Sequence, residues 1–310
     1  MGVLNPSSNR RRTNPDAGAT TLGIVERSVG YLAQGYKDAT LKSIIQRFNC
    51  ITGVGTLVSD TGYQRWYQAG VTGNAQGYYS INNTFAYNRF NYSTLTSSAA
   101  FTTPKSNSVT VNDLNLYTQA WILCTDSPGW AGVGVTDYQK VNLATETPVS
   151  RGNLSSGPTG FTRQGCNSAT HGFFLGYTDT TCYILNFSTE VVTSVGGSPD
   201  SGMQLVCGMS VTNNKGYWVG LIPYNIRMSF TSGTVSGFAS ATAYTYHFGE
   251  SHSLVNNTFG FMFAGYYDTT GRYGGTQHAL CQRMTLATES MTTMSDLVEA
   301  QSSGQMMQGF

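Results

Sequence analysis

Apolar and polar residues alternate with a period of two in a seven-residue segment that recurs six times along the chain. The second and fourth positions of this segment are apolar in every copy, and the third is always Asn, Ser or Thr. Such alternation predicts a β-strand with one side facing a core. The copies are RFNCITG (47–53), RFNYSTL (89–95), KVNLATE (140–146), ILNFSTE (184–190), RMSFTSG (227–233) and RMTLATE (283–289).

The sixth position is Ser or Thr in every copy, and it falls where the strand is expected to end. A hydroxyl there can bond the backbone of a following tight turn. Successive copies of this position are 42 to 56 residues apart, which indicates a constant core joined by loops of changing length. A strand of Gly and aromatic residues precedes five of the six copies, as at 30–33 and 260–263.

With one weaker strand before and another after, each unit has about four strands, the composition of a propeller blade. The sequence therefore predicts an all-β chain, a six-bladed β-propeller of four-stranded antiparallel blades. We expect the propeller at 20–297, between an extended N-terminal arm (1–19) and a C-terminal arm (298–310). The expected blades are 20–60, 61–103, 104–155, 156–198, 199–240 and 241–297.

Composition supports sheets and turns and excludes several partners. Charged residues are 11% of the chain, while Gly (36) and Tyr (19) are abundant. The net charge of +1 predicts no nucleic-acid binding, since the one basic run, at 10–12, lies in the N-terminal arm. No apolar stretch approaches the roughly 18 residues that span a bilayer. The N-terminus also has no apolar signal region, so we expect folding in a cytoplasm.

The cysteines and the first column of the repeat both favour structural roles. Four cysteines lie among apolar residues of expected strands, where free thiols behave as small hydrophobes. We expect buried free thiols rather than disulfides or metal ligands, because no pair has CxxC spacing. The first column is mostly Arg or Lys beside a repeated Asn, which predicts a structural bond within each blade. The four cysteines are Cys50, Cys182, Cys207 and Cys281.

Candidate catalytic residues are few. His247 and His252 flank a turn that contains Glu250 and Ser251, but neighbours in a turn do not have the geometry of a catalytic triad. We expect structural or surface roles for all four histidines, which also include His171 and His278. The glycine-rich stretches 132–134 and 271–275 follow no phosphate-binding pattern and are expected to be loop tips.

A propeller glycosidase would need an acidic pair near the axis. The segment 60–66 (DTGYQRW) resembles the Asp box of sialidase propellers, but it occurs once and its Trp comes one residue late, which favours a plain turn. The other acidic residues do not recur at one blade position, which weighs against such an enzyme. They are Asp113, Asp126, Asp137, Asp179, Asp200 and Asp268.

The landmark GYLAQGY (30–36) and the segment LATES (286–290) resemble the kelch-type repeats of galactose-oxidase-like propellers. They are more similar to the degenerate form found in many tailed-bacteriophage virion proteins. The resemblance covers most of 20–297. The copper-binding Tyr, His and Cys set of galactose oxidase has no counterpart here, so oxidase chemistry is not implied.

The resemblance implies a non-enzymatic structural protein of the virion, in the tail nozzle, adaptor or a fibre. No catalytic, cofactor-binding or metal residue is expected, and the binding residues are not assigned. Partners would be other virion proteins, contacted through the arms and loops in a multi-copy assembly, and Met306, Met307 and Phe310 are expected to dock there. The alternative is a lectin-like receptor binder that stacks host glycans on Trp130 and Tyr273; a glycoside hydrolase is a third possibility.

Overall fold

The computed structural model of this chain describes most of its strands and tight turns. The described residues are 29–37, 40–60, 70–73, 75–81, 86–103, 106–112, 118–125, 135–152, 165–168, 170–175, 181–197, 207–211, 215–219, 225–238, 252–255, 258–263, 266–267, 276–277, 281–294 and 305–309.

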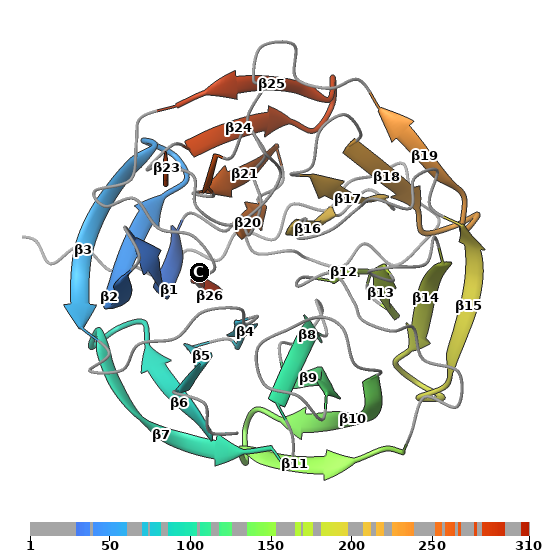
Figure 1. Cartoon of the computed structure of the whole chain (residues 1–310), viewed down its shortest axis with the longest axis horizontal. Coiled ribbons are helices and arrows are strands. Elements are labelled where there is room, and N and C mark those ends of the chain that lie inside the picture. The colour runs from blue at the N-terminus through green and yellow to red at the C-terminus, as the bar shows by residue number, and fades with distance from the viewer. Residues whose placement is uncertain are drawn as a thin grey trace, which may run out of the picture.

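The described residues form six four-stranded sheets and one two-stranded sheet, and every strand pairing is antiparallel. Figure 1 shows the four-stranded sheets arranged around a common centre, in the order in which the chain visits them. We number them sheets 1 to 6 in that order. The junction between two neighbouring sheets is named by their numbers.

The strands of the first three sheets are given in the order in which they pair. Sheet 1 contains β26 (Gln305–Gly309), β1 (Val29–Lys37), β2 (Thr40–Asn49) and β3 (Val54–Asp60). Sheet 2 contains β4 (Val71–Thr72), β5 (Gln76–Ile81), β6 (Ala86–Asn91) and β7 (Thr96–Thr102). Sheet 3 contains β8 (Ser106–Asn112), β9 (Gln119–Thr125), β10 (Val135–Asn142) and β11 (Thr147–Ser150).

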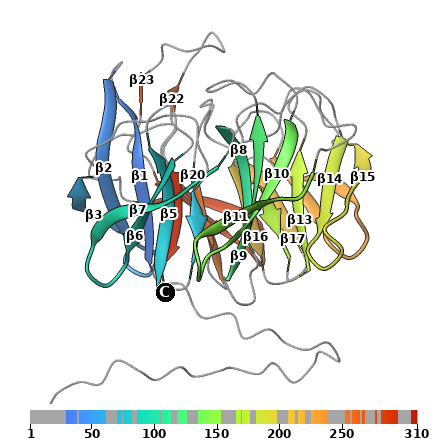
Figure 2. The same cartoon turned by 90° about the horizontal axis from the view of Figure 1, so that it is seen from below.

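The remaining sheets follow the same plan. Sheet 4 contains β12 (Cys166–Asn167), β13 (His171–Leu175), β14 (Thr181–Asn186) and β15 (Val192–Gly197). Sheet 5 contains β16 (Cys207–Val211), β17 (Lys215–Val219), β18 (Asn225–Ser229) and β19 (Val235–Phe238). Sheet 6 contains β20 (His252–Val255), β21 (Phe259–Phe263), β24 (Cys281–Thr285) and β25 (Ser290–Thr293). Between β21 and β24 the chain forms the small hairpin β22 (Tyr266–Tyr267) and β23 (Thr276–Gln277), which projects beyond one face of the ring in Figure 2.

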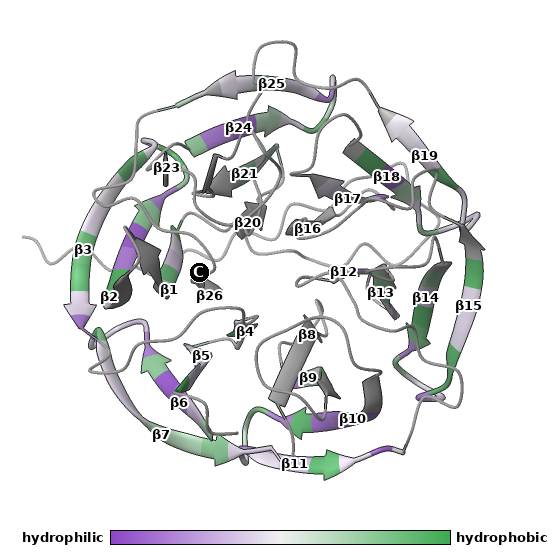
Figure 3. Cartoon of the chain, viewed as in Figure 1, coloured by the Kyte–Doolittle hydropathy of each residue, from purple (hydrophilic) through white to green (hydrophobic). Residues whose placement is uncertain are grey.

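The recurring segment lies at the third strand of each sheet, as predicted, but that strand ends three residues before the sixth position, where its end was expected. In every copy the strand ends at the third residue of the segment, from Asn49 in β2 to Thr285 in β24. Figure 3 shows both hydrophilic and hydrophobic residues along β2, β6, β10 and β24. The prediction of an all-β chain built from antiparallel sheets is confirmed, and the arrangement is compatible with a β-propeller.

The C-terminal strand differs from the expectation of an arm that docks on a neighbouring subunit. β26 pairs with β1 of the same chain, with Val29 opposite Gly309 and Ala33 opposite Gln305. Sheet 1 therefore joins strands from the two ends of the described chain. The side chains of Met306 and Met307, Phe310 and the N-terminal arm (1–19) lie outside the described residues, so their docking stays a prediction.

The core lies between neighbouring sheets rather than inside one of them. Leu32 and Phe48 of sheet 1 pack with Phe261 and Cys281 of sheet 6, and all four side chains are buried. Aromatic rings also stack across junctions, as with Trp121 and Phe187, whose centroids are 4.2 Å apart. Each such pair adds about 0.5–1.5 kcal/mol beyond its buried area. The sheets are thus held face to face, and their junctions set the stability of the whole ring.

Candidate functional site: polar junctions between the sheets

A side-chain amide holds the tight turn that follows the recurring strand in sheets 1 to 4. In the sheet 3 turn, Oδ1 of Asn142 accepts hydrogen bonds from the backbone N–H of Ala144 at 2.9 Å and of Thr145 at 3.2 Å. The equivalent asparagines accept the same two bonds in sheets 1, 2 and 4; they are Asn49, Asn91 and Asn186. Asn is suited to this position because its short side chain reaches its own backbone two residues on.

The hydroxyl at the sixth position only partly does what was predicted. Oγ of Ser232 accepts a bond from the backbone N–H of Thr234 at 3.3 Å, which agrees with the prediction. Thr94 and Thr288 instead bond the hydroxyl of the residue two places on, each at 2.7 Å. The main backbone bonds of the turn are supplied by the third residue, which the sequence pattern marked only as small and polar.

The seventh residue of the segment ends the turn with a positive φ. Gly53 (φ 74°) and Gly233 (φ 67°) adopt this geometry without strain, whereas an L-residue pays about 1 kcal/mol for it. Leu95 (φ 56°) and three glutamates (φ 55° to 57°) nevertheless adopt it. Such a conformation is retained where the side chain has a specific task. The three glutamates are Glu146, Glu190 and Glu289.

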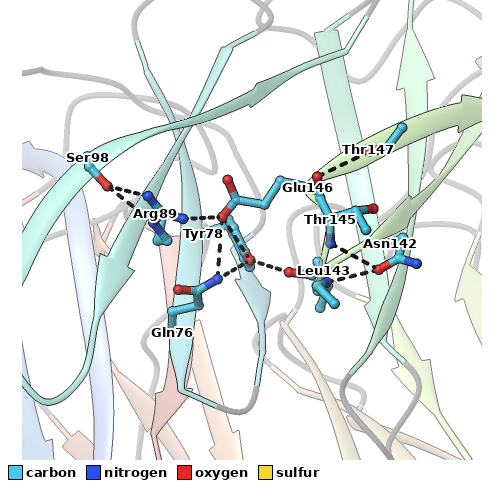
Figure 4. Close-up of polar contacts among 10 residues, drawn as sticks. Gln76, Tyr78, Arg89, Ser98, Asn142, Leu143, Thr145, Glu146 and Thr147 are labelled. Atoms are coloured by element: carbon cyan, nitrogen blue, oxygen red, sulfur yellow. Dashed lines mark hydrogen bonds and ion pairs between the residues drawn. The ribbon is translucent and has the colours of Figure 1, made fainter.

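Glu146 shows that task at the 2/3 junction (Figure 4). Its carboxylate reaches from the sheet 3 turn to sheet 2, where Oε1 lies 2.9 Å from Nη1 of Arg89 and 3.4 Å from Nε2 of Gln76. The Tyr78 hydroxyl lies 3.3 Å from the same oxygen and 2.9 Å from the Leu143 carbonyl oxygen. Burial raises the pKa of Tyr78 to about 12, so this hydroxyl remains a donor at any physiological pH.

Glu190 joins sheet 4 to sheet 3 in a similar way. Its Oε1 lies 2.6 Å from Nζ of Lys140, and its Oε2 lies 2.9 Å from Nε of Arg151. The Tyr138 hydroxyl donates to the backbone carbonyl of Glu190 at 2.5 Å. Lys140 also lies over the Trp121 ring, 5.5 Å from its centroid. The carboxylate is therefore held by two cations of the preceding sheet.

Glu289 joins sheet 6 to sheet 5 and, like Glu146, is contacted by three donors. Nη1 of Arg227 contacts Oε2, while Nζ of Lys215 (3.3 Å) and the Tyr217 hydroxyl (3.0 Å) contact Oε1. Burial alone would raise the pKa of Glu289, but the hydrogen bonds from Arg227, Tyr217 and Lys215 hold it below its usual value. The carboxylate thus stays ionised, although its side chain is only 15% exposed.

We call each contact between a first-position cation and a seventh-position glutamate of the next sheet an inter-sheet clamp. The clamps add a partner in the next sheet to the predicted bond within a blade. The bond within a blade is present where Arg89 donates to Ser98 and where Arg227 donates to Ser236, each in its own sheet. The partner in the next sheet was not predicted, because the seventh position varies among Glu, Gly and Leu and no acidic column stands out. Clamps are present at the 2/3, 3/4 and 5/6 junctions.

The other three junctions depart from this pattern in different ways. At 4/5, Ile184 replaces the cation and Gly233 replaces the glutamate. At 1/2, Arg47 faces a repeat whose seventh residue is Leu95, which packs against the core shared by sheets 1 and 2. At 6/1, Arg283 is present but the seventh residue is Gly53.

Few of the catalytic candidates fall in the described part of the chain. His171 is half-buried. Its Nδ1 lies 2.8 Å from the Thr170 hydroxyl oxygen, and its Nε2 lies 3.1 Å from the Asn186 side-chain nitrogen. Burial lowers the pKa of His171. These contacts give it a structural role. The His252 side chain, His247, His278, Glu250 and Ser251 lie outside the described residues.

The acidic and aromatic candidates are placed in the same limited way. Asp137 is buried and accepts bonds from Gln139 Nε2 at 2.6 Å and Ser150 Oγ at 3.0 Å, which is a structural use of the carboxylate. Asp60 ends β3, and the rest of the segment 60–66 lies outside the described residues. So do Trp130, Tyr273, the loop tips 132–134 and 271–275, and the five remaining aspartates: Asp113, Asp126, Asp179, Asp200 and Asp268.

The described cysteines agree with the prediction of buried free thiols. The thiols of Cys50, Cys182, Cys281 and Cys166 are buried, and none of them is in a disulfide. Burial raises the pKa of Cys50 and of Cys182 to about 12, so neither forms a reactive thiolate near neutral pH. The side chain of Cys207 lies outside the described residues. Within the described ranges, no group of three or more His, Cys, Asp or Glu side chains is placed to hold a metal ion, and no helix could cross a membrane.

Comparison with known proteins defines a fold and no family. The fold resembles that of YjhT, a kelch-like, sialidase-type β-propeller protein, with a TM-score of 0.61 over 78% of this chain and 87% of that chain. The two sequences are 11% identical, so the likeness is one of fold alone. No protein-family model matches the chain, and no curated protein sequence matches it either.

Proposed function

We propose that sheets 1 to 6 are the blades of a six-bladed β-propeller and that β26 closes the ring. The protein would serve as a non-enzymatic structural component of a tailed-bacteriophage virion. Two features support the ring: consecutive sheets share cores, and β26 joins the last part of the chain to the first sheet. The virion role is supported by the resemblance of the repeat to those of phage virion proteins.

One observation carries the structural role. The carboxylates of all three clamps are engaged by two or more donors, and each of these contacts holds one sheet to the next. A catalytic carboxylate must instead remain open to a substrate on one side. The recurring charged residues therefore act as ties within a scaffold. Contacts with partners would be left to the loops, the N-terminal arm and the outer edge strands.

The outer edge of sheet 1 offers one surface for such contacts. Ile51 (72% exposed), Val54 (52%) and Leu57 (48%) lie on the β2–β3 turn and on β3, the edge strand farthest from β26. Exposed apolar side chains on an edge strand favour association with another protein. The expected partners are other virion proteins in a multi-copy assembly.

The direct test is whether the protein is part of the particle. Virions of the phage that encodes this chain would be purified by density gradient, analysed by mass spectrometry and labelled with a specific antibody. We expect the chain at a fixed copy number per virion and a label at one position on the particle. Absence from purified virions, together with saturable binding on a glycan array, would favour the lectin-like alternative. Turnover of an envelope polysaccharide would favour a hydrolase.

A further inference from the structure

The three clamps share one geometry: a first-position cation of one sheet meets a carboxylate that the next sheet supplies from the seventh position. Arg89 meets Glu146, and Arg227 meets Glu289. The cation in each case lies on the strand face directed at the next sheet. The charge of the cation and that of the carboxylate are thus matched within one junction.

At the 6/1 junction the cation is present without the carboxylate. Arg283 lies opposite Phe261 across the β21–β24 pair, and the Phe261 ring contacts Phe48 of sheet 1, with 5.6 Å between centroids. Cross-strand partners share a sheet face, so Arg283 also faces sheet 1. The residue that would supply the carboxylate is Gly53, which has no side chain.

The environment of Arg283 provides part of what a guanidinium needs. Its carbon Cζ lies 4.4 Å from the centroid of the Phe259 ring, a favourable cation–π contact. Its Nε is buried, yet it has no hydrogen-bond partner within the described part of the chain. A buried donor without a partner costs about 1–3 kcal/mol. In Arg89 and Arg227 the same atom donates to a serine of its own sheet, and Nη1 is the atom that meets the carboxylate of the next sheet.

The 4/5 junction indicates that packing between two sheets does not require an arginine at the first position. There the cation and the carboxylate are lost together, and the first position is Ile184, whose neighbours form an apolar core. The fold therefore accepts an aliphatic residue at the first position when no carboxylate is available. At the 1/2 junction Arg47 also has no glutamate at the seventh position, but there Leu95 supplies a side chain, whereas Gly53 places none opposite Arg283.

We propose that the 6/1 junction is an anion site in which Arg283 binds a carboxylate supplied from outside the fold of this chain. The ligand is a dissolved carboxylate or an acidic side chain of another protein chain, since the two present the same chemistry. It takes the position that Glu146, Glu190 and Glu289 fill at the clamped junctions. Occupancy would tie sheet 6 to sheet 1, where β26 also pairs.

The test uses NMR of the full-length protein, with the Nε–H resonance of Arg283 assigned by its loss in Arg283→Lys. Acetate replaces chloride at constant ionic strength. We expect a saturable shift of this resonance in the wild-type protein. In Gly53→Glu the resonance should start near its saturated position and no longer respond, because the chain now supplies its own carboxylate. Gly233→Glu, which faces Ile184, should respond like the wild type.

Thermal unfolding gives an independent readout if Gly53→Glu does not fold. Saturating acetate should raise the wild-type Tm by about 2 °C, and Arg283→Ile, which copies the residue of the 4/5 junction, should show no rise. A Tm that rises with protein concentration without acetate identifies a neighbouring chain as the source. Equal acetate responses in wild type and Arg283→Ile, or an Nε–H resonance that does not shift, would overturn the proposal. Both readouts are independent of any role in a virion.

Discussion

The clamp at the 5/6 junction allows a quantitative test of how the ring is held together. Glu289→Gln keeps the shape of the side chain but removes the charge that Arg227, Lys215 and Tyr217 bind. Hydrogen bonds to charged groups contribute about 1.5–3 kcal/mol where they are buried. The side chains of Arg227 and Lys215 are 38% and 41% exposed, so solvent screens their attraction. We expect a total loss of about 2 kcal/mol, close to that of one buried charged bond.

A double-mutant cycle separates the pair from its surroundings. Arg227→Ile and Glu289→Gly together reproduce at this junction the residues of the natural 4/5 junction. Glu289→Gly should cost less than Glu289→Gln, because glycine relieves roughly 1 kcal/mol of strain at φ 55°. We expect a coupling energy near 1 kcal/mol for the Arg227–Glu289 pair, measured by urea unfolding at pH 7. A coupling below about 0.3 kcal/mol would refute the view that the clamp stabilises the ring.

The pH dependence gives the same test a definite sign. Because the folded pKa of Glu289 is lowered, its contribution is fully present above the unfolded pKa of about 4.3 and is lost as the pH falls through the folded value. The difference in stability between wild type and Glu289→Gln should therefore be constant from pH 7 to about pH 5 and shrink below pH 4.5. A difference that stays constant down to pH 3 would contradict an ionised clamp.

Three further outcomes are expected. Asn142→Ala should lower the unfolding free energy by about 1 kcal/mol, because the turn loses the Oδ1 acceptor. Asn142→Asp keeps an acceptor there and should keep most of the stability, and a thermal scan of both variants measures the difference. Gly216→Ala should lower the unfolding free energy by about 1–3 kcal/mol, since the added Cβ would lie 2.7 Å from the Phe230 ring and 2.9 Å from Cβ of Cys166. Adding Phe230→Leu should recover part of this loss, as measured by urea unfolding. Cys182, with a pKa of about 12, should react with a disulfide reagent at pH 8 only as fast as the protein unfolds, and rapid labelling of the folded protein would contradict its burial.

The strands and turns could be predicted from the sequence because their causes are local. Alternation across residues such as Phe48 and Cys50 reflects a strand with one buried side, and both side chains are buried in the structure. The strand end at Asn142 is equally local, since the asparagine bonds the backbone only two and three residues on. Such signals repeat in each unit and reinforce one another.

The clamps and the C-terminal strand could not be predicted because their causes lie far apart in the sequence. Arg89 and Glu146 are in different repeats, and glutamate occupies only half of the seventh positions. One sequence signal did point to the clamps: the repeat that has Ile184 in place of the cation is followed by a repeat that has Gly233 in place of the glutamate. The segment QMMQG of β26 has no alternation of apolar and polar residues. Its place is set by backbone pairing with β1, which composition does not reveal.

The pairing of β26 with β1 also bears on how the protein is made. Of the described strands, β1 leaves the ribosome first and its partner β26 leaves last. At about 5–20 residues per second, one edge of β1 stays open for tens of seconds while the other sheets emerge. During that time nascent chains on one message could exchange strands or bind a chaperone. A stop codon that removes β26 would leave that edge open for good.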